Sequence, residues 1–410
     1  MTSAPIVRAI PWRIALPIAE SMRVLFLTHS FPRQPGDAAG SFVLRLATSL
    51  RNEGIDTSVV APAAPGLADR DRLDGIPVER FRYAPRRYET LAYTGNMAAQ
   101  FQNSWSARVT MLGFLGAEFR SAVRARREFE PDLVHAHWWF PNGLVGTWLA
   151  RMSNKPLVTT LHGTDVRLAR TVAFSRPAFR HVMHHSAAVT AVSHYLASEA
   201  QEVVSAPAPV VAPMPVSAEL FSPGGHRDKH RLLFVGRLNK QKGIEVLLHA
   251  LNRIPDASIG LDVVGDGDDR AALEELARAL GLGDRVRWCG AIPQPQLVDF
   301  YRSAAALVVP SIAEGLGLVA VEAQLCETPV VAFDSGGLPD IIQHDKTGIL
   351  VPQVDAGALA AALISLLERD DRGASLGAAG RLRALATFAP ESVARRYADI
   401  YRSAIDRSPK

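Results

Sequence analysis

The chain alternates short apolar or β-branched runs with longer segments of helical periodicity along almost its whole length. This alternation is typical of parallel sheets that are covered by helices on both faces. In the first half, strands are expected at residues 23–28, 57–61, 133–137, 157–162 and 188–192. In the second half, they are expected at residues 231–235, 261–264, 286–289, 305–309, 330–333 and 348–351. The pattern therefore predicts an α/β protein with two doubly wound sheets.

A proline-rich passage, "SAPAPVVAPMPVSAELFSP", interrupts this alternation as a linker between two domains would. Prolines and arginines break up the first 21 residues, and no clear signal-peptide cleavage site follows them. We therefore divide the chain into a flexible extension (1–21), a first domain (22–204), a linker (205–223), a second domain (224–390) and a final helix that packs back towards the first domain (391–410). Ligands of such sheets bind beyond the carboxyl ends of the strands.

Composition narrows the classes of function. The 410 residues suffice for two domains of roughly 100–200 residues each. Forty-five basic and 41 acidic residues nearly balance, which argues against a nucleic-acid-binding protein. The two cysteines, Cys289 and Cys326, provide no disulfide framework and suit a reducing cytoplasm. No apolar run approaches the ~20 residues of a membrane-spanning helix, so we expect a cytoplasmic protein, either soluble or peripherally attached.

The stretch "LLFVGRLNKQKGIEVLLHAL" combines a strand end with two cations. The strand ends at Gly236, Arg237 follows, and Lys242 with Gly243 opens a helix. A guanidinium fork, an ammonium group and a helix N-terminus together form a good diphosphate site. The stretch lacks the spacing of a nucleoside-triphosphate loop, and it is equally compatible with two solvated cations on a loop.

The stretch "PSIAEGLGLVAVEAQL" places two glutamates eight positions apart around a strand-to-helix turn. Gly315 and Gly317 let backbone amides approach a phosphate closely, and the helix is expected to begin near Leu318. Glu314 would meet hydroxyl groups in the cleft. An unpaired buried charge costs several kcal/mol, so Glu322 binds a vicinal diol such as ribose, pairs with a nearby arginine, or lies on a helix that is less buried than its apolar sequence suggests.

Three histidines follow strands of the first domain. His135 and His137 lie in "VHAHWWFPNG", and "LHGTDV" ends the next strand at His162, with Asp165 nearby. The ligand spacing of a zinc site and the G-x-S-x-G elbow of a serine hydrolase are both missing from the sequence. We interpret His137, His162 and Asp165 as polar groups that contact a polyhydroxylated substrate.

Other motifs favour turns or surfaces over chemistry. Asp266 and Asp268 spell an Asp-x-Asp pattern that a strand-to-helix turn explains without a metal, and the first loop has no G-x-G-x-x-G fingerprint of a nicotinamide or flavin enzyme. Two basic stretches, 80–88 and 119–129, either are solvated faces or contact anionic lipid headgroups of the inner membrane face.

Taken together, the motifs resemble those of the retaining glycosyltransferases of family four, which have the GT-B fold of two facing Rossmann-like domains. The similarity runs from Met22 to the final helix and includes "LHGTDV", "VTAVSHYL", "FVGRLNKQKG", "VVGDGDD", "PSIAEGLGLVAVEA" and "PVVAFDSGGLPDIIQHDKTGILV". The chain departs from the family where Ser41 follows Gly40, in its linker, and at Asp340, where glutamate is commoner. We expect these departures to alter the hinge and to leave activity intact.

The resemblance implies a role for each motif residue, with the acceptor in the first domain and the donor in the second. Arg237 and Lys242 would hold the donor diphosphate and stabilise the leaving group. Glu322 would hold the ribose, Glu314 the transferred sugar, and His162 would lie against the reacting bond. The implied catalytic residues are His162, Glu314, Arg237 and Lys242. The implied donor-binding residues are Gly40, Gly236, Arg237, Lys242, Glu314, Gly315, Gly317, Leu318 and Glu322.

The implied reaction is the transfer of a hexose, with retention and without a metal or other cofactor, from a nucleoside-diphosphate sugar. The acceptor would be a saccharide or a lipid-linked molecule in cell-surface polysaccharide or glycolipid synthesis. Two alternatives stay open: a catalytically silent subunit that binds sugar nucleotides, and a sugar phosphorylase or epimerase on a similar fold.

Overall fold

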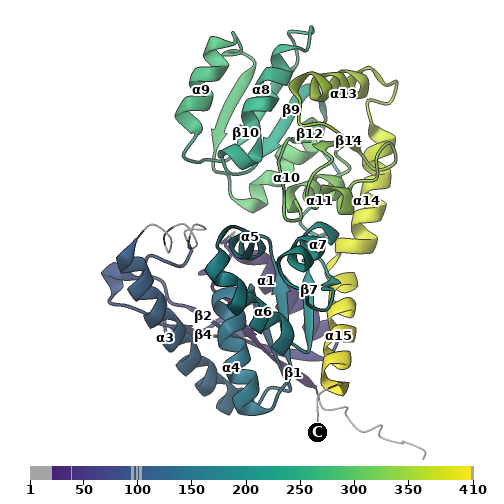
Figure 1. Ribbon diagram of the computed structural model, residues 1–410. Helices are drawn as coiled ribbons and strands as arrows, with labels where there is room; N and C mark the ends of the chain where they lie inside the picture. Colours follow the sequence, from purple (N-terminus) through teal and green to yellow (C-terminus); the bar gives the residue numbers. More distant parts are fainter. Residues whose placement is uncertain (1–20, 38, 94–96, 98–99, 101–103, 408–410) are drawn as a thin grey trace, which may run out of the picture.

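The computed structural model describes residues 21–37, 39–93, 97, 100 and 104–407 (Figure 1). The predicted flexible extension lies outside the described residues except for Ser21, and so do the last three residues of the chain. Two α/β domains stand one above the other, each built on a twisted sheet with helices on both faces (Figure 1). The expected fold class is confirmed.

Eight strands form the first sheet, in the order β3-β4-β2-β1-β5-β6-β7-β8. All its neighbours pair in parallel except β3 with β4. β1 lies in the middle, where Val24 pairs with Thr57 on one side and Leu133 on the other. The bounds are β1 Met22–Leu27, β2 Ile55–Pro62, β3 Arg70–Leu73, β4 Ile76–Phe81, β5 Leu133–His137, β6 Leu157–Leu161, β7 Ala188–Ala191 and β8 Val210–Val211.

Helices cover both faces of this sheet, and their buried sides are apolar. They are α1 Ser41–Asn52, α3 Trp105–Phe129, α4 Leu144–Ser153, α5 Thr164–Thr171, α6 Arg176–His185 and α7 His194–Val203. Short helical turns occur at η1 Arg86–Tyr88, η2 Trp139–Gly143 and η3 Ala173–Ser175. α3 starts at an N-cap serine, Ser104, whose side chain accepts a hydrogen bond from the amide of Ala107.

The second sheet has six parallel strands in the order β11-β10-β9-β12-β13-β14. Its strands are β9 Asp228–Val235, β10 Gly260–Val264, β11 Val286–Gly290, β12 Ala304–Val309, β13 Val330–Phe333 and β14 Ile349–Val351. Its helices are η4 Lys240–Lys242, α8 Ile244–Asn252, α9 Arg270–Ala279, α10 Gln294–Ser303, α11 Leu318–Leu325, α12 Leu338–Ile341, α13 Ala356–Glu368 and α14 Ala374–Phe388.

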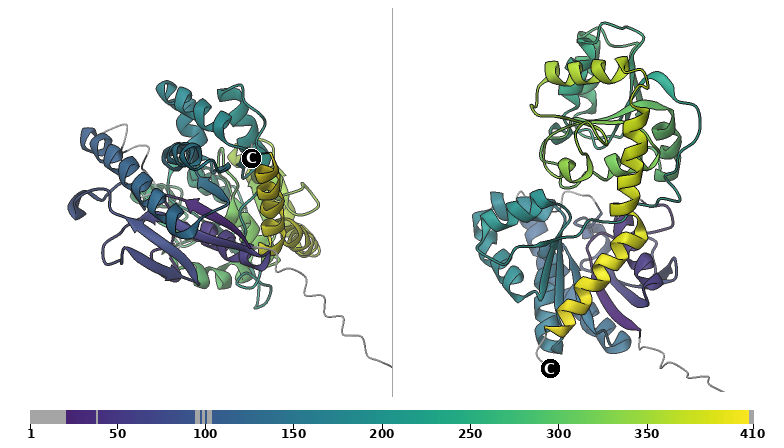
Figure 2. Two further views of the ribbon diagram at one scale, coloured as in Figure 1. Left: turned by 90° about the horizontal axis from the view of Figure 1, so that it is seen from below. Right: turned by 90° about the vertical axis from the view of Figure 1, so that its right-hand side faces the viewer.

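The last helix, α15 (Pro390–Asp406), continues from α14 and returns along the first domain (Figure 2). It packs against α1 and β6. Its buried tyrosines complete the core there, because the Tyr401 hydroxyl lies 2.7 Å from Nδ1 of His135 and the Tyr397 hydroxyl donates to the carbonyl of Ala212 at 3.1 Å. The end of the chain thus ties the two domains together.

The structure contains three strands that the sequence pattern did not predict. β3 and β4 form an edge hairpin whose turn holds Asp74 at φ 49° and Gly75 at φ 77°. An Asp-Gly pair between two strand-like segments is a strong hairpin signal. The signal was missed because three of the four residues of β3 are charged, so this segment does not have the apolar pattern of a strand. β8 is the other, because part of the proline-rich linker pairs with β7 and extends the first sheet.

Candidate active site

A cleft of about 1090 Å³ lies between the domains, beyond the carboxyl ends of β6, β7, β9 and β12. Parallel α/β sheets place their ligand sites at this edge. The first domain contributes side chains from the loops after β6 and β7, and the second domain contributes the segments 237–242 and 312–319. Of the predicted residues, the cleft is lined by His162, Arg237, Lys242, Glu314, Gly315, Gly317 and Leu318.

Arg237 and Lys242 lie on the floor that the second domain provides. Gly243 follows in a left-handed conformation with φ 67°, and a Cβ there would lie 2.0 Å from the carbonyl oxygen of Pro310. The turn therefore packs directly on the end of β12 and fixes both cations at the cleft. Arg237 is exposed, and its guanidinium forms no hydrogen bond or ion pair with any residue that the structure describes. It is available for an anionic ligand.

Lys242 and Glu314 form an ion pair across the cleft floor. The Lys242 Nζ lies 2.6 Å from Glu314 Oε2, and both side chains are mostly shielded from water. The sequence assigned these residues to different parts of one donor, the diphosphate and the sugar. In the structure they neutralise each other.

The glycines of the glutamate loop allow close approaches. Gly317 has φ 96° and precedes α11, whose first residue, Leu318, lines the cleft. The unpaired amides at the start of a helix favour anions. At Gly315 the second domain lies directly against the first. A Cβ added at this position would lie 3.1 Å from the carbonyl oxygen of His162, and the Gly315 carbonyl accepts a hydrogen bond of 2.6 Å from Ser193 Oγ.

Glu322 is buried, and its carboxylate is fully engaged. Tyr301 donates to Oε2 at 2.7 Å and Gln294 donates to Oε1 at 2.9 Å. Burial raises the pKa of Glu322, while these two hydrogen bonds and the nearby charge of Arg45 favour its ionised form. Glu322 does not line the cleft, so its contact with a ribose stays a prediction, and its nearest partners are a phenol and an amide.

His162 presents its ring to the cleft from a crowded aromatic setting. Its ring centroid lies 4.2 Å from that of Trp138 and 5.3 Å from that of Phe42. His162 Nε2 lies 3.1 Å from Nδ1 of His137, so one imidazole donates and the other accepts. Burial lowers the pKa of His162 well below its usual value, and burial lowers that of His137 to about 3. Both rings are neutral near pH 7.

Asp165 and His137 do not line the cleft, so direct contact of either side chain with the substrate stays a prediction. Asp165 Oδ1 accepts hydrogen bonds from the amides of His162 and Gly163 at 3.1 and 2.8 Å, and Oδ2 accepts one from Trp139. His137 is completely buried behind His162. The hydrogen bonds of Asp165 and His137 therefore hold the His162 loop in place.

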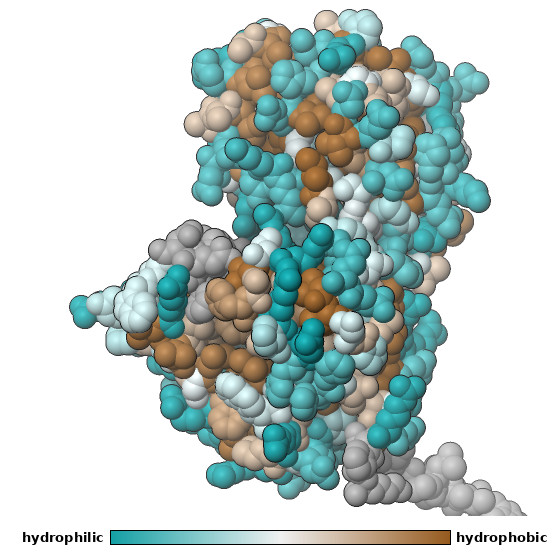
Figure 3. Space-filling model, in the orientation of Figure 1, coloured by the Kyte–Doolittle hydropathy of each residue, from teal (hydrophilic) through white to brown (hydrophobic). Residues whose placement is uncertain are grey.

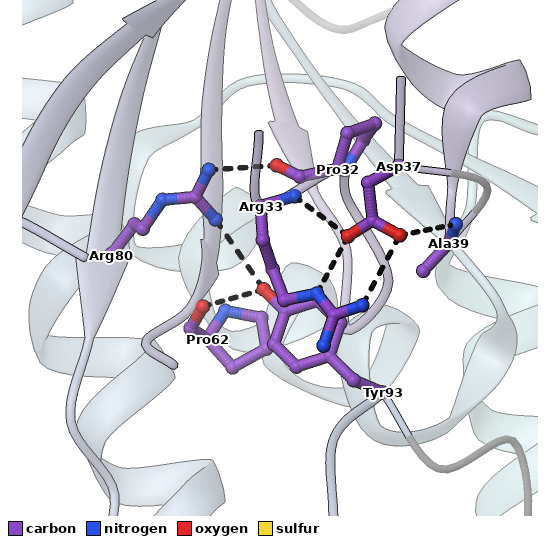
Figure 4. Close-up of polar contacts among 7 residues, drawn as sticks. All are labelled: Pro32, Arg33, Asp37, Ala39, Pro62, Arg80 and Tyr93. Carbon is purple, nitrogen blue, oxygen red and sulfur yellow. Dashed lines mark hydrogen bonds and ion pairs between the residues drawn. The ribbon is translucent and has the colours of Figure 1, made fainter. Parts of the chain in front are cut away.

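Gly40 belongs to the loop after β1 and does not line the cleft. It has φ 69°, and a Cβ would lie 2.2 Å from the carbonyl oxygen of Ser30. The same loop is held by Arg33, whose Nε lies 2.6 Å from Asp37 Oδ2, and by Arg80, which donates to the carbonyl of Pro32 at 2.8 Å (Figure 4). Two residues after Gly40, Phe42 reaches His162.

The basic stretch 80–88, for which either a solvated face or a lipid contact was expected, is only partly internal, because Arg80 is buried whereas Arg86 and Arg87 are exposed. Arg80 is only 2% exposed and lies beside the Tyr93 hydroxyl, 3.4 Å away (Figure 4). Arg82 pairs with Glu89. Arg80 belongs to β4, a strand that the sequence pattern missed, and this explains why its burial was not expected.

The sequence also missed several side chains that line the cleft. Phe42 and Trp138 line the cleft but were given no role from the sequence, although the position of Trp138 directly after His137 at a strand end was an available signal. Arg167 lines the first-domain wall, and its Nη1 donates to Gln241 Oε1 of the second domain at 3.4 Å. Nearby, the amide of His194 donates to Asp340 Oδ2 at 2.6 Å, which adds another hydrogen bond between the domains.

Two features are absent from the part of the chain that the structure describes. No three His, Cys, Asp or Glu side chains in that part of the chain converge to hold a metal ion. None of its helices is long and apolar enough to cross a membrane.

Two facing doubly wound domains with a cleft between them are the arrangement of the GT-B fold. The family models described as "Glycosyltransferase Family 4" and "Glycosyl transferases group 1" match residues 39–220 and 217–383. D-inositol 3-phosphate glycosyltransferase 1 of Catenulispora acidiphila is 32% identical over 90% of this chain and 92% of its own length. The chain belongs to glycosyltransferase family 4, as the sequence motifs indicated.

Other relatives and solved structures agree with this assignment. The D-inositol 3-phosphate glycosyltransferase of Thermobispora bispora is 35% identical over 73% of this chain and 78% of its own. Sucrose-phosphate synthase from Thermosynechococcus elongatus superposes with a TM-score of 0.79 at 26% identity, covering 94% of this chain and all of that one. HepE from Anabaena, solved with UDP and glucose, has the same fold, with a TM-score of 0.68 at 21% identity over 93% of this chain and all of that one.

Proposed function

We propose that the protein transfers a hexose, with retention of anomeric configuration, from a nucleoside-diphosphate sugar to a saccharide or lipid-linked acceptor. The proposed setting is the synthesis of a cell-surface polysaccharide or glycolipid at the cytoplasmic side of the membrane, without a metal. The observation that carries the proposal is the convergence of Arg237, Lys242 and the N-terminus of α11 at one end of the cleft.

These groups suit a diphosphate that becomes a leaving group. When the bond to the sugar breaks, negative charge grows on the phosphate oxygen, and fixed cations and helix amides oriented towards it stabilise that charge without reorganisation. Arg237 offers a fork of donors and Lys242 a point charge. In this proposal the protein cations perform the role that a divalent metal performs in other transferases.

The ion pair of Lys242 with Glu314 suggests how donor binding proceeds. A diphosphate that takes over Lys242 releases the Glu314 carboxylate, which then accepts hydrogen bonds from the sugar hydroxyls. The neutral ring of His162 lines the same cleft as the glutamate loop, and in this proposal it faces the sugar from the first domain. A neutral imidazole supplies a hydrogen-bonding group without attracting the diphosphate away from its cations.

The relatives guide the choice of substrates. HepE was solved with UDP-glucose, and the curated relatives are named for D-inositol 3-phosphate. Uridine, guanosine and adenosine diphosphate sugars therefore form the donor panel. Simple saccharides, D-inositol 3-phosphate and lipid extracts form the acceptor panel.

The test measures nucleotide release from each donor with each acceptor, in the presence and absence of a chelator. We expect one donor to be turned over, release to survive chelation, and Lys242→Met to abolish it. The anomeric configuration of the product, read by NMR, tests retention. Inversion, dependence on a metal, or no turnover with any donor would each contradict the proposal.

A further inference from the structure

Helices α3 and α4 of the first domain expose large apolar side chains to solvent. On α3, Trp105 is 76% exposed, Val109 53% and Leu112 71%. Their spacing of four and three residues puts them on one face of the helix. On α4, Trp148 and Met152 are 42% and 49% exposed. Contiguous exposed apolar groups of this kind mark an interaction surface.

The two helices share this surface. They pack against each other, and the ring of Phe119 on α3 meets that of Trp148 on α4 edge to face, with centroids 6.1 Å apart. Figure 3 shows brown side chains gathered over the region of α3 and α4. We call the surface formed by Trp105, Val109, Leu112, Trp148 and Met152 the docking face.

The docking face continues into a basic rim. Arg120 and Arg127 follow on the same side of α3, and Arg151 lies on α4 between Trp148 and Met152; all three are exposed. No ion pair engages these three guanidinium groups within the described chain. The two acidic residues of α3 do not neutralise the rim, because Glu118 is buried and Glu128 Oε1 lies 2.6 Å from Arg70 Nη2.

We propose that the docking face binds the surface of an anionic lipid bilayer. An interfacial helix inserts apolar groups at the boundary between headgroups and acyl chains and presents cations to anionic headgroups. Tryptophan prefers this boundary. The combination of apolar centre and unpaired arginines matches a bilayer in charge and in polarity. The inference goes beyond the proposed reaction, because binding to lipid requires neither donor nor acceptor.

This proposal relocates the lipid contact that the sequence suggested. In the stretch 80–88, Arg80 is buried and Arg82 is paired, so only Arg86 and Arg87 stay exposed, and they do not lie on α3 or α4. In the stretch 119–129, Arg120 and Arg127 are exposed and could still contact lipid headgroups. They border the docking face, whose apolar residues on α3 precede them in the sequence. No role was assigned to these apolar residues from the sequence, because helical periodicity alone does not distinguish a stripe that packs in the core from one that faces solvent.

The experiment is cosedimentation of the full chain with vesicles of phosphatidylcholine, alone or mixed with phosphatidylglycerol. We expect binding to the mixed vesicles only. Leu112→Glu should weaken this binding about tenfold or more. It removes a leucine side chain that the bilayer would bury, and it adds a negative charge that the anionic headgroups repel. The matched control is Leu382→Glu on α14, where the leucine is 72% exposed and the substitution should leave binding unchanged.

A second arm tests the rim. Arg120→Glu combined with Arg127→Glu should abolish binding to the mixed vesicles, whereas Arg395→Glu, at an exposed position of α15, should not. Equal binding by the wild type and Leu112→Glu would overturn the proposal. So would a wild type that ignores vesicles but forms dimers that Leu112→Glu dissociates in light scattering. Because no substrate is present, this result is independent of the transferase assay.

Discussion

At the scale of single residues, the ion pair between Lys242 and Glu314 makes a prediction that separates binding from catalysis. Glu314→Gln removes the competitor of the diphosphate for Lys242, so we expect this variant to bind the free nucleoside diphosphate at least as tightly as the wild type. Its kcat should nevertheless fall by about 10²–10³, the usual effect of removing one group that stabilises the transition state. Titration calorimetry and steady-state kinetics measure the two quantities.

Removing the other partner of this ion pair, in Lys242→Met, should have the opposite effect on nucleotide affinity. It removes the cation and leaves Glu314 at the cleft, so affinity for the nucleoside diphosphate should fall together with kcat. If both variants lost nucleotide affinity equally, Glu314 would not compete with the diphosphate, and the proposed exchange of partners would be wrong.

At the scale of elements, the loop from β1 to α1 connects the first domain to the cleft. Gly40→Ala places a Cβ 2.2 Å from the carbonyl oxygen of Ser30 and forces φ 69° on a non-glycine residue. Since Phe42 follows and contacts His162, we expect kcat/KM to fall at least about tenfold, which corresponds to 1.4 kcal/mol. Steady-state kinetics with the preferred donor is the measurement.

Gly36 of the same loop provides the control. It has φ 82°, but a Cβ there meets nothing within 4 Å. Gly36→Ala should therefore cost only the conformational strain of about 1–2 kcal/mol in stability and leave kcat/KM near the wild-type value. Equal losses of activity in both variants would show that the close approach at Gly40 does not position the site.

The sequence predicted elements well where one pattern dominated. The range 330–333 agrees with β13, a buried and continuous apolar run, and the range 133–137 agrees with β5, in which Leu133 and Val134 begin a fully buried strand. β3 was missed because an edge strand exposes polar side chains, and β8 because two residues carry no periodicity. The sequence motifs also predicted most of the residues of the candidate site. They did not predict the side chains that form hydrogen bonds with Glu322. Tyr301 and Gln294 reach it from another helix, and no local pattern encodes that contact.

At the scale of the whole molecule, buried titratable groups link stability to pH. Burial lowers the pKa of His29 to about 4 and of His137 to about 3, and lowers those of His135 and His162 well below the usual value. Each imidazole binds a proton more readily in the unfolded chain, so the free energy of unfolding decreases as pH falls below about 6.5. The histidines therefore limit stability on the acid side.

Glu118 acts in the opposite direction. It is completely buried, Asn142 donates to its Oε1 at 2.6 Å, and burial raises its pKa to about 8. The folded chain therefore holds this proton more tightly than the unfolded chain, in which a glutamate titrates near 4.5. The contribution of Glu118 to stability is fully present below about pH 4.5 and is lost as pH rises to about 8. Glu118→Gln cannot ionise and should escape that loss.

We expect the free energy of unfolding of Glu118→Gln, relative to the wild type, to increase between pH 5 and pH 8 by a few kcal/mol, since each unit of pKa shift is worth about 1.4 kcal/mol. Urea denaturation followed by tryptophan fluorescence at pH 5, 7 and 9 measures the difference. Glu130→Gln, at the exposed end of α3, controls for the loss of one surface charge. A difference that stays constant with pH would mean that Glu118 is ionised in the folded chain, and that the pocket beside Asn142 shelters a charge.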